Sequence, residues 1–229
     1  MSARLQMVVF DMDDTLYPER EFVLGGFRAA ADSLDRITGR VTGAYDVFVE
    51  VMERQGVGKV FDEGLPRLGV EPGPDLIEAL VTAFREHRPA LRPHAGVREL
   101  LRDLRARGVR LGLVTDGPLA VQQAKWAALG LQDLFEVVVF ADAIAGKASW
   151  KPTPAPYDEV ERLSGLSGGA LGYVGDRPWK DFPIPDQRGW RTARVRFDCA
   201  FHRDSPDIAP GRPEARTVTE LRAILSGWL

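Results

Sequence analysis

The chain has 229 residues, which allows one large domain or one domain that carries an insertion. Hydrophobic residues make up 45% of the chain and charged residues 28%, a globular composition that excludes general disorder. The net charge of −3 leaves no basic excess for binding nucleic acid, and a single cysteine excludes a disulfide framework or a cysteine-rich zinc site.

The start of the chain, MSARLQMVVFD, lacks the apolar stretch of a signal peptide. No apolar run elsewhere approaches the ~18 residues that a membrane span needs. We therefore expect a cytoplasmic protein whose partners include neither a membrane nor a nucleic acid.

Short apolar runs, rich in Val and ended by polar or glycine residues, predict strands that are buried on both faces. Helical patterns follow most of them, as at Val97 to Leu104 and at Ala120 to Leu129. Strands that alternate with helices indicate βαβ units, and so an α/β fold with a parallel sheet. The runs are Met7–Phe10, Leu111–Thr115, Val137–Phe140, Leu171–Gly175 and Thr192–Val195.

The segment after the first strand breaks this rhythm. Roughly 75 residues pass after Phe10 without a convincing strand, and the apolar residues repeat at helical spacing. The pattern predicts a helical bundle over 17–92, inserted into an α/β domain made of 1–16 and 93–229. The helical stripes run from Val23 to Ile37, from Tyr45 to Met52 and from Leu76 to Phe84.

Unusual polar residues stand at or after the carboxyl ends of the strands, where open α/β sheets bind ligands. Each alone could be an ordinary turn or helix-capping residue. Together, however, the aspartates would crowd like charges on one sheet edge, which is costly unless a cation neutralises them. Oxygen ligands suit Mg²⁺, and a hydroxyl, backbone N–H groups and a lysine could cradle a phosphate. The segments are Asp11-Met12-Asp13-Asp14-Thr15, Thr115-Asp116-Gly117, Lys151-Pro152, and Gly175-Asp176 with Asp181.

These segments match, in order, four motifs of a known family. DMDDTL fits D-x-D-x-[TV], Thr115 closes the second core strand, Lys151 precedes Pro-x-Pro, and GDRPWKD fits G-D-x-x-x-x-D. The chain thus resembles the haloacid dehalogenase-like (HAD) hydrolases over essentially its whole length. The resemblance implies a Rossmann-like parallel sheet and identifies the helical insertion as a C1-type cap, typical of the capped phosphatase branch.

The resemblance also implies a role for each motif residue. Asp11 would be the nucleophile that forms an aspartyl-phosphate, and Asp13 would protonate the leaving group and later activate water. Mg²⁺ would be held by the Asp11 carboxylate, the Asp13 carbonyl and Asp176. The remaining motif residues would bind the substrate phosphate (Thr115, Asp116 and Lys151) or support the metal site (Asp181 and Gly175).

Two positions leave the motif pattern open. Lys147 competes with Lys151 for the third-motif role, although the Pro-x-Pro sequence favours Lys151. Asp116 stands where Asn is frequent, which changes how this loop meets the substrate. Lysine is scarce in the chain, with only residues 59, 125, 147, 151 and 180, and two of these five lie just before or within a motif.

The predicted cap carries 10 basic and 13 acidic residues, which argues against substrates with several phosphates. We expect a small phosphorylated metabolite with one phosphate ester, such as a nucleotide, phosphoglycolate or a sugar phosphate. The sequence does not predict the oligomeric state.

Three other functions remain open. A phosphomutase or phosphotransferase of the same family would pass the phosphoryl group to another hydroxyl instead of water. A 2-haloacid dehalogenase would share Asp11 but needs no Mg²⁺ and typically lacks the second aspartate. A non-catalytic phosphate-binding protein or a receiver-like regulator would also pair acidic residues with Thr and Lys, but receivers are shorter and their phosphorylated Asp ends the third strand.

Overall fold

The computed structural model describes residues 4–39 and 41–229 and divides the chain into two compact units. One unit joins Met1–Glu19 to Leu91–Leu229, and the other is Arg20–Ala90. In the part of the chain that is described, no helix has both the length and the apolar character needed to cross a bilayer.

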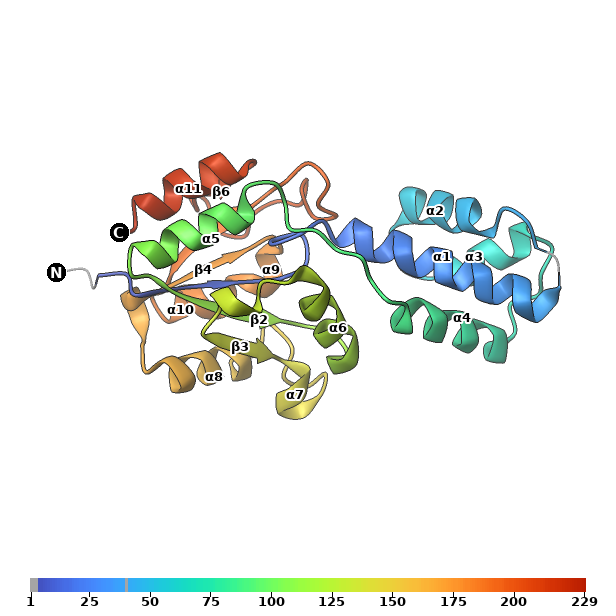
Figure 1. Cartoon of the computed structure of the whole chain (residues 1–229), viewed down its shortest axis with the longest axis horizontal. Helices are drawn as coiled ribbons and strands as arrows, with labels where there is room; N and C mark the ends of the chain where they lie inside the picture. The colour runs from blue at the N-terminus through green and yellow to red at the C-terminus, as the bar shows by residue number, and fades with distance from the viewer. Residues whose placement is uncertain (1–3, 40) are drawn as a thin grey trace. The chain divides into compact units, whose positions relative to one another are not determined.

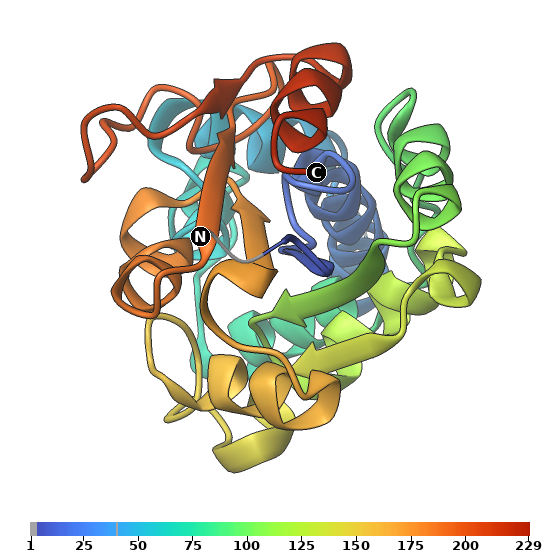
Figure 2. The same ribbon diagram turned by 90° about the vertical axis from the view of Figure 1, so that its left-hand side faces the viewer.

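A six-stranded sheet forms the centre of the first unit (Figures 1 and 2). All strand pairs are parallel, and the order is β3-β2-β1-β4-β5-β6. This arrangement confirms the predicted α/β fold with a parallel sheet. The strands are β1 Met7–Phe10, β2 Arg110–Thr115, β3 Val137–Phe140, β4 Leu171–Gly175, β5 Arg191–Val195 and β6 Glu214–Ala215.

The central strands are hydrophobic along their whole length because helices cover both faces of the sheet. Helices α5 (Val97–Ala106) and α11 (Val218–Ser226) pack beside each other on one face (Figure 1). Helix α8 (Ala155–Ser164) packs on β2 and β3 from the other face, where Tyr157 joins the buried core. The sheet is therefore a rigid support for the loops at its carboxyl edge.

Other short elements fill the loops of the same unit. Helix α6 follows β2, and two short helices follow β4. Their bounds are α6 Leu119–Leu129, α7 Asp142–Ala145, α9 Pro178–Asp181 and α10 Pro183–Gln187, with 3-10 turns η1 Gln132–Leu134 and η2 Gly168–Ala170. The sequence did not indicate the strand β6, because two residues are too few to show a period and they end a Pro- and Arg-rich stretch.

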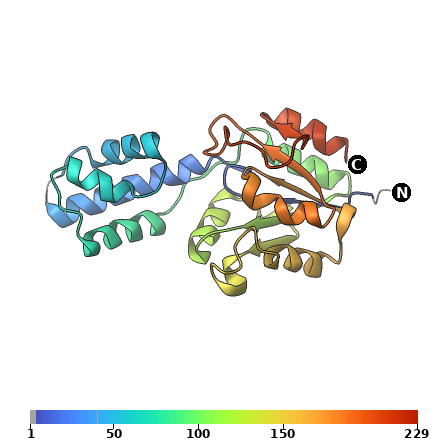
Figure 3. The same cartoon turned by 180° about the vertical axis from the view of Figure 1, so that it is seen from behind.

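The second unit is a bundle of helices (Figures 1 and 3). The aromatic ring of Phe27 packs against Phe48, Phe61 and Phe84, one from each of the other three helices. Ile37, expected in the apolar stripe of the first helix, is 55% exposed because it lies in the last turn. The helices are α1 Glu19–Thr38, which begins at the last residue of the first unit's N-terminal segment, α2 Ala44–Gln55, α3 Val60–Arg67 and α4 Pro74–Glu86.

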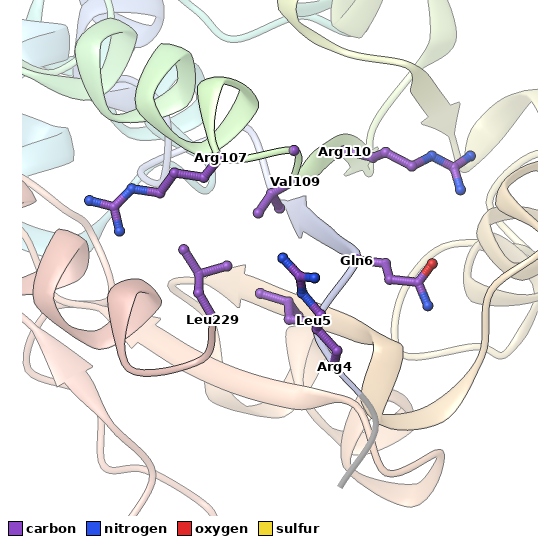
Figure 4. Close-up of a pocket in the computed structure, with 8 residues that line it drawn as sticks. Arg4, Leu5, Gln6, Arg107, Val109, Arg110 and Leu229 are labelled. Carbon is purple, nitrogen blue, oxygen red and sulfur yellow. The ribbon is translucent and has the colours of Figure 1, made fainter.

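A hollow of about 500 Å³ opens at the amino ends of β1 and β2 (Figure 4). Arg4, Gln6 and Arg107 line it, beside the residues that lead into the two strands. The residues with predicted chemical roles lie elsewhere, at the carboxyl ends of the strands.

Candidate active site

Asp11 and Lys151 form a buried ion pair at the carboxyl edge of the sheet. Asp11 follows β1 directly, and its N–H donates to the Val174 carbonyl of β4 at 2.8 Å. Its Oδ1 accepts a hydrogen bond from Lys151 Nζ at 2.5 Å. Burial raises the pKa of Asp11 to about 7 although Lys151 opposes the shift, so the carboxyl needs positive charge to stay ionised.

Lys151 is held by three groups at once. Besides Asp11, its ammonium donates to Asp181 Oδ1 at 2.6 Å and to the Tyr173 hydroxyl at 3.1 Å. Burial disfavours the ammonium, but Asp11 and Asp181 raise the pKa of Lys151 well above its usual value, so it stays charged. The other candidate lysine, Lys147, is exposed, and its Nζ lies 5.9 Å from the centre of the Trp150 ring.

Asp176, at the end of β4, is a buried carboxylate whose Oδ2 lies 3.9 Å from Arg177 Nε. Both of its oxygens are buried, and neither has a hydrogen-bond donor among the described residues. Burial, and then the charges of Asp181 and Asp11, raise the pKa of Asp176 well above its usual value. A buried charge that accepts no hydrogen bond is costly, so these oxygens suit the binding of a cation.

The donor set fits a hard divalent ion. Asp11, Asp176 and Asp181 each offer one carboxylate oxygen, and these three atoms lie within 4.8 Å of one another. Asp181 already accepts from Lys151 Nζ and, at 2.8 Å, from the Arg177 N–H, whereas Asp176 has both oxygens available. Asp11 and Asp176 are therefore the two side chains best placed to hold such an ion.

Gly175 gives Asp181 the space that it occupies. A Cβ at position 175 would lie 2.6 Å from Asp181 Cγ, closer than any real contact. Because glycine has no Cβ, the helix α9 can bring Asp181 against the end of β4, where its carboxylate accepts a hydrogen bond from Lys151.

Asp13 is surrounded by donors. Its Oδ1 accepts from the Tyr17 hydroxyl at 2.5 Å and from Lys125 Nζ at 2.9 Å, and its Oδ2 accepts from Gln122 Nε2 at 2.9 Å. Burial works to raise the pKa of Asp13, but Lys125, Tyr17 and Gln122 outweigh it and lower the pKa. Asp13 is thus fixed next to Asp11 with its charge stabilised.

Gln122 connects the first and second motifs. Its Nε2 donates to Thr115 Oγ1 at 2.7 Å and to the Asp116 carbonyl at 2.5 Å, as well as to Asp13. Thr115 ends β2 and is 1% exposed. The Gln122 amide therefore fixes the Thr115 hydroxyl and the Asp13 carboxylate relative to each other.

Asp116, predicted to bind the substrate phosphate, has a side chain that contacts two lysines of the protein. Its Oδ1 accepts from the Lys151 N–H at 3.0 Å, and its Oδ2 lies 3.2 Å from Lys180 Nζ. Both oxygens are thus occupied by groups of the protein.

Asp14 does not join the acidic cluster. Its two oxygens accept from the N–H groups of Glu19 and Phe201, each at 2.8 Å, and its φ of 55° turns the chain away from β1. Asp14 is thus a structural residue that ties two loops together.

The sequence did not single out Tyr17, Gln122, Lys125 or Lys180 as site residues. For the lysines a signal existed, because Lys125, Lys151 and Lys180 are three of only five in the chain, and all three pair with aspartates here. Tyr17 and Gln122 carried no comparable signal.

Comparison with known proteins gives the family. The family model of the haloacid dehalogenase-like hydrolases matches residues 5–184. The glyceraldehyde 3-phosphate phosphatase of Methanopyrus kandleri is 33% identical over 223 residues, 91% of this chain and 94% of the relative. The N-acetylmuramic acid 6-phosphate phosphatase of Pseudomonas aeruginosa is 28% identical over 89% of this chain and 87% of its own length.

The fold is also that of solved family structures. The 2-haloacid dehalogenase from Pseudomonas syringae superposes with a TM-score of 0.64 at 22% identity, covering 98% of this chain and all of that chain. Such a likeness shows the fold alone, since one fold carries many chemistries. With the family model and the similar phosphatases, it gives one conclusion: the chain is an enzyme that belongs to the haloacid dehalogenase-like hydrolases.

Proposed function

We propose that this hydrolase is a Mg²⁺-dependent phosphatase that cleaves a small phosphate monoester through an aspartyl-phosphate on Asp11. The observation that carries the proposal is the buried cluster in which Asp11 meets Lys151 at 2.5 Å beside Asp176, whose oxygens accept no hydrogen bond from the described residues. In such a cluster, the lysine can bind an anionic group of the substrate and the carboxylates can bind a cation.

In the first step, a carboxylate oxygen of Asp11 attacks the phosphorus, and the bond between phosphorus and the ester oxygen breaks. Asp13, which must take up a proton when the substrate binds because its pKa is lowered in the free site, gives that proton to the departing oxygen, which leaves as an alcohol. In the second step, Asp13 takes a proton from water as the water oxygen attacks the aspartyl-phosphate. The bond from phosphorus to Asp11 then breaks, releasing inorganic phosphate.

The phosphate oxygens would be held by Thr115 and Lys151. The Lys151 ammonium already contacts Asp11, so it would bind phosphate oxygens next to the attacking atom. Asp181 would keep the ammonium in place, since it donates to this carboxylate at 2.6 Å.

Asp11, Asp176 and the Asp13 carbonyl would hold the metal. When bound, Mg²⁺ would neutralise the crowded carboxylates and stabilise charge on the phosphoryl oxygens. The oxygens of Asp176, which accept no hydrogen bond from the described residues, support this assignment.

For the substrate, the curated relatives favour a small sugar phosphate. Those reported above are phosphatases of glyceraldehyde 3-phosphate and N-acetylmuramic acid 6-phosphate. We therefore take glyceraldehyde 3-phosphate as the first compound to test. The assay is run at neutral pH, as suits an enzyme that we propose to be cytoplasmic. The helical unit Arg20–Ala90 would be the cap that selects among such esters.

A panel assay tests the proposal. The protein is incubated with glyceraldehyde 3-phosphate, phosphoglycolate, N-acetylmuramic acid 6-phosphate, glucose 1-phosphate, a nucleoside monophosphate and 2-chloropropionate, with Mg²⁺ or with EDTA. We expect phosphate release from at least one ester, its loss in EDTA, and its loss in Asp11→Asn. Chloride release from 2-chloropropionate would instead indicate a dehalogenase, and conversion of glucose 1-phosphate to its 6-phosphate without phosphate release a mutase.

A further inference from the structure

The carboxylate of Asp116 joins three loops of the site. Asp116 follows β2 and is 9% exposed at its side chain. One oxygen binds the backbone N–H of Lys151, at 3.0 Å, and the other lies 3.2 Å from the ammonium of Lys180, in the helix α9. Through these bonds the second motif holds the third and the fourth.

Lys151 is consequently fixed at both ends. Asp116 holds its backbone N–H, and Asp181 and Asp11 hold its ammonium. Lys180 lies next to Asp181 in α9, so the ion pair between Asp116 and Lys180 also anchors the helix that supplies Asp181.

An asparagine at position 116 could not make the same link. Its carbonyl oxygen could accept from the Lys151 N–H, but its amide NH₂ would face the Lys180 ammonium, so two donors would meet. An aspartate without Lys180 would bring one more negative charge to a site that already holds Asp11 and Asp176. The two residues therefore depend on each other.

We propose that Asp116 and Lys180 act as one positioning pair that sets Lys151 for binding phosphate. This inference rests on the proposed phosphatase function and adds two positioning residues to it. In this proposal, neither the Asp116 nor the Lys180 side chain touches the reacting atoms. The charge of Asp116 is used to orient the lysine instead of meeting the substrate.

The chain offers a matched control for Lys180. Lys147 Nζ and Lys180 Nζ each lie 5.9 Å from the centre of the Trp150 ring, but in the described residues only Lys180 pairs with Asp116. Lys147→Met therefore removes a neighbouring positive charge from the same tryptophan and leaves the pair intact.

The test compares Asp116→Asn, Lys180→Met, the double variant, Lys180→Arg and Lys147→Met. Affinity for inorganic phosphate is measured by calorimetry with Mg²⁺ present, turnover by phosphate release, and folding by circular dichroism and urea unfolding. We expect the Kd for phosphate and kcat/KM to worsen about tenfold in each charge-removing variant of the pair. The double variant should be no worse than Asp116→Asn, because the pair acts as a unit. Lys180→Arg and Lys147→Met should stay within about twofold of the wild type.

Three outcomes would contradict the proposal that Asp116 and Lys180 act as one positioning pair. These are phosphate affinity unchanged in Lys180→Met, losses that multiply in the double variant, or a Lys147→Met loss as large as that of Lys180→Met. A loss of folding stability with unchanged phosphate affinity would likewise mean a structural role alone. If the wild type neither binds phosphate nor hydrolyses an ester, the proposed function itself fails and the pair with it.

Discussion

At the scale of single residues, the central feature is a lysine shared by two aspartates. Lys151 lies at 2.5 Å from Asp11 and at 2.6 Å from Asp181, and all three side chains are buried. The sequence left Lys147 and Lys151 as alternatives for the third-motif lysine. Lys151 is buried, whereas Lys147 is exposed.

We predict that Lys151→Ala lowers kcat/KM by about 100-fold or more, since it removes the cation next to the attacking carboxylate. Lys147→Ala should change kcat/KM by less than about twofold, because exposed charges contribute little. Steady-state phosphate release by the two variants checks this. A greater loss in Lys147→Ala would reverse the assignment of the third motif.

A second residue, His94, contributes to how stability depends on pH. Burial lowers the pKa of His94 from 6.5 to about 4, and its ring packs on Phe197 with centres 4.5 Å apart. Between pH 4 and pH 6.5, His94 therefore binds a proton in the unfolded chain but not in the folded chain. Stability from this group is complete above pH 6.5 and falls as the pH drops toward 4.

His94→Phe should remove this dependence. Between pH 7 and pH 5 we expect the wild type to lose about 2 kcal/mol more free energy of unfolding than the variant. Urea unfolding at both pH values measures the difference, and all other titrating groups are common to the two proteins. Equal losses in the two proteins would show that His94 accepts a proton in the folded state.

At the scale of elements, the strands and the long helices could be predicted from the sequence, while the connections between the site residues could not. A strand such as β4 is buried along its whole length, so its apolar run is visible in the sequence. Parallel strands bring their carboxyl ends together, which is why Asp11 and Asp176 could be placed on one edge. By contrast, the contact of Gln122 with Asp13 depends on how α6 packs, which spacing along the chain does not encode.

Local chemistry also explains why Asp14 is not one of the three carboxylates that could hold a metal ion. Adjacent residues share a loop, but a φ of 55° at Asp14 directs its carboxylate to backbone N–H groups. Such a conformation is uncommon for a residue with a side chain, and no pattern in the sequence predicts it.

In the helical unit, close packing of α1 on α4 gives a prediction about Gly26. A Cβ at Gly26 would lie within 3.0 Å of three atoms of the Phe84 ring. Alanine favours a helix by about 1 kcal/mol over glycine, but the overlap should reverse the sign and destabilise the unit by about 1–3 kcal/mol. Thermal unfolding of Gly26→Ala measures this, and adding Phe84→Leu should recover part of the loss. A more stable Gly26→Ala would show that the ring can move aside freely.

At the scale of the whole molecule, the acidic cluster trades stability for function. The carboxylate of Asp176 accepts no hydrogen bond in the described part of the chain and lies 3.9 Å from Arg177 Nε, whereas Asp181 accepts hydrogen bonds through both oxygens. Removing the charge of Asp176 should therefore relieve a cost, and removing that of Asp181 should create one.

We predict that Asp176→Asn raises the melting temperature in EDTA at pH 8 by about 2–4 °C, and that Asp181→Asn lowers it. Adding Mg²⁺ should raise the melting temperature of the wild type and leave that of Asp176→Asn unchanged. Differential scanning calorimetry with and without Mg²⁺ gives both values. An equal response to Mg²⁺ in Asp176→Asn would remove this side chain from the metal site.

The central claim is that the phosphoryl group passes through Asp11 and that Asp13 handles the proton. With p-nitrophenyl phosphate, nitrophenolate leaves without needing a proton, so Asp13→Asn should complete the first step and stall before the second. Rapid mixing should then show a burst of about one nitrophenolate per enzyme molecule, with the phosphoryl group retained on Asp11. The same burst should be absent when Asp11→Asn is added to Asp13→Asn. A linear release of nitrophenolate with no burst and no phosphoryl group on Asp11 would contradict the account.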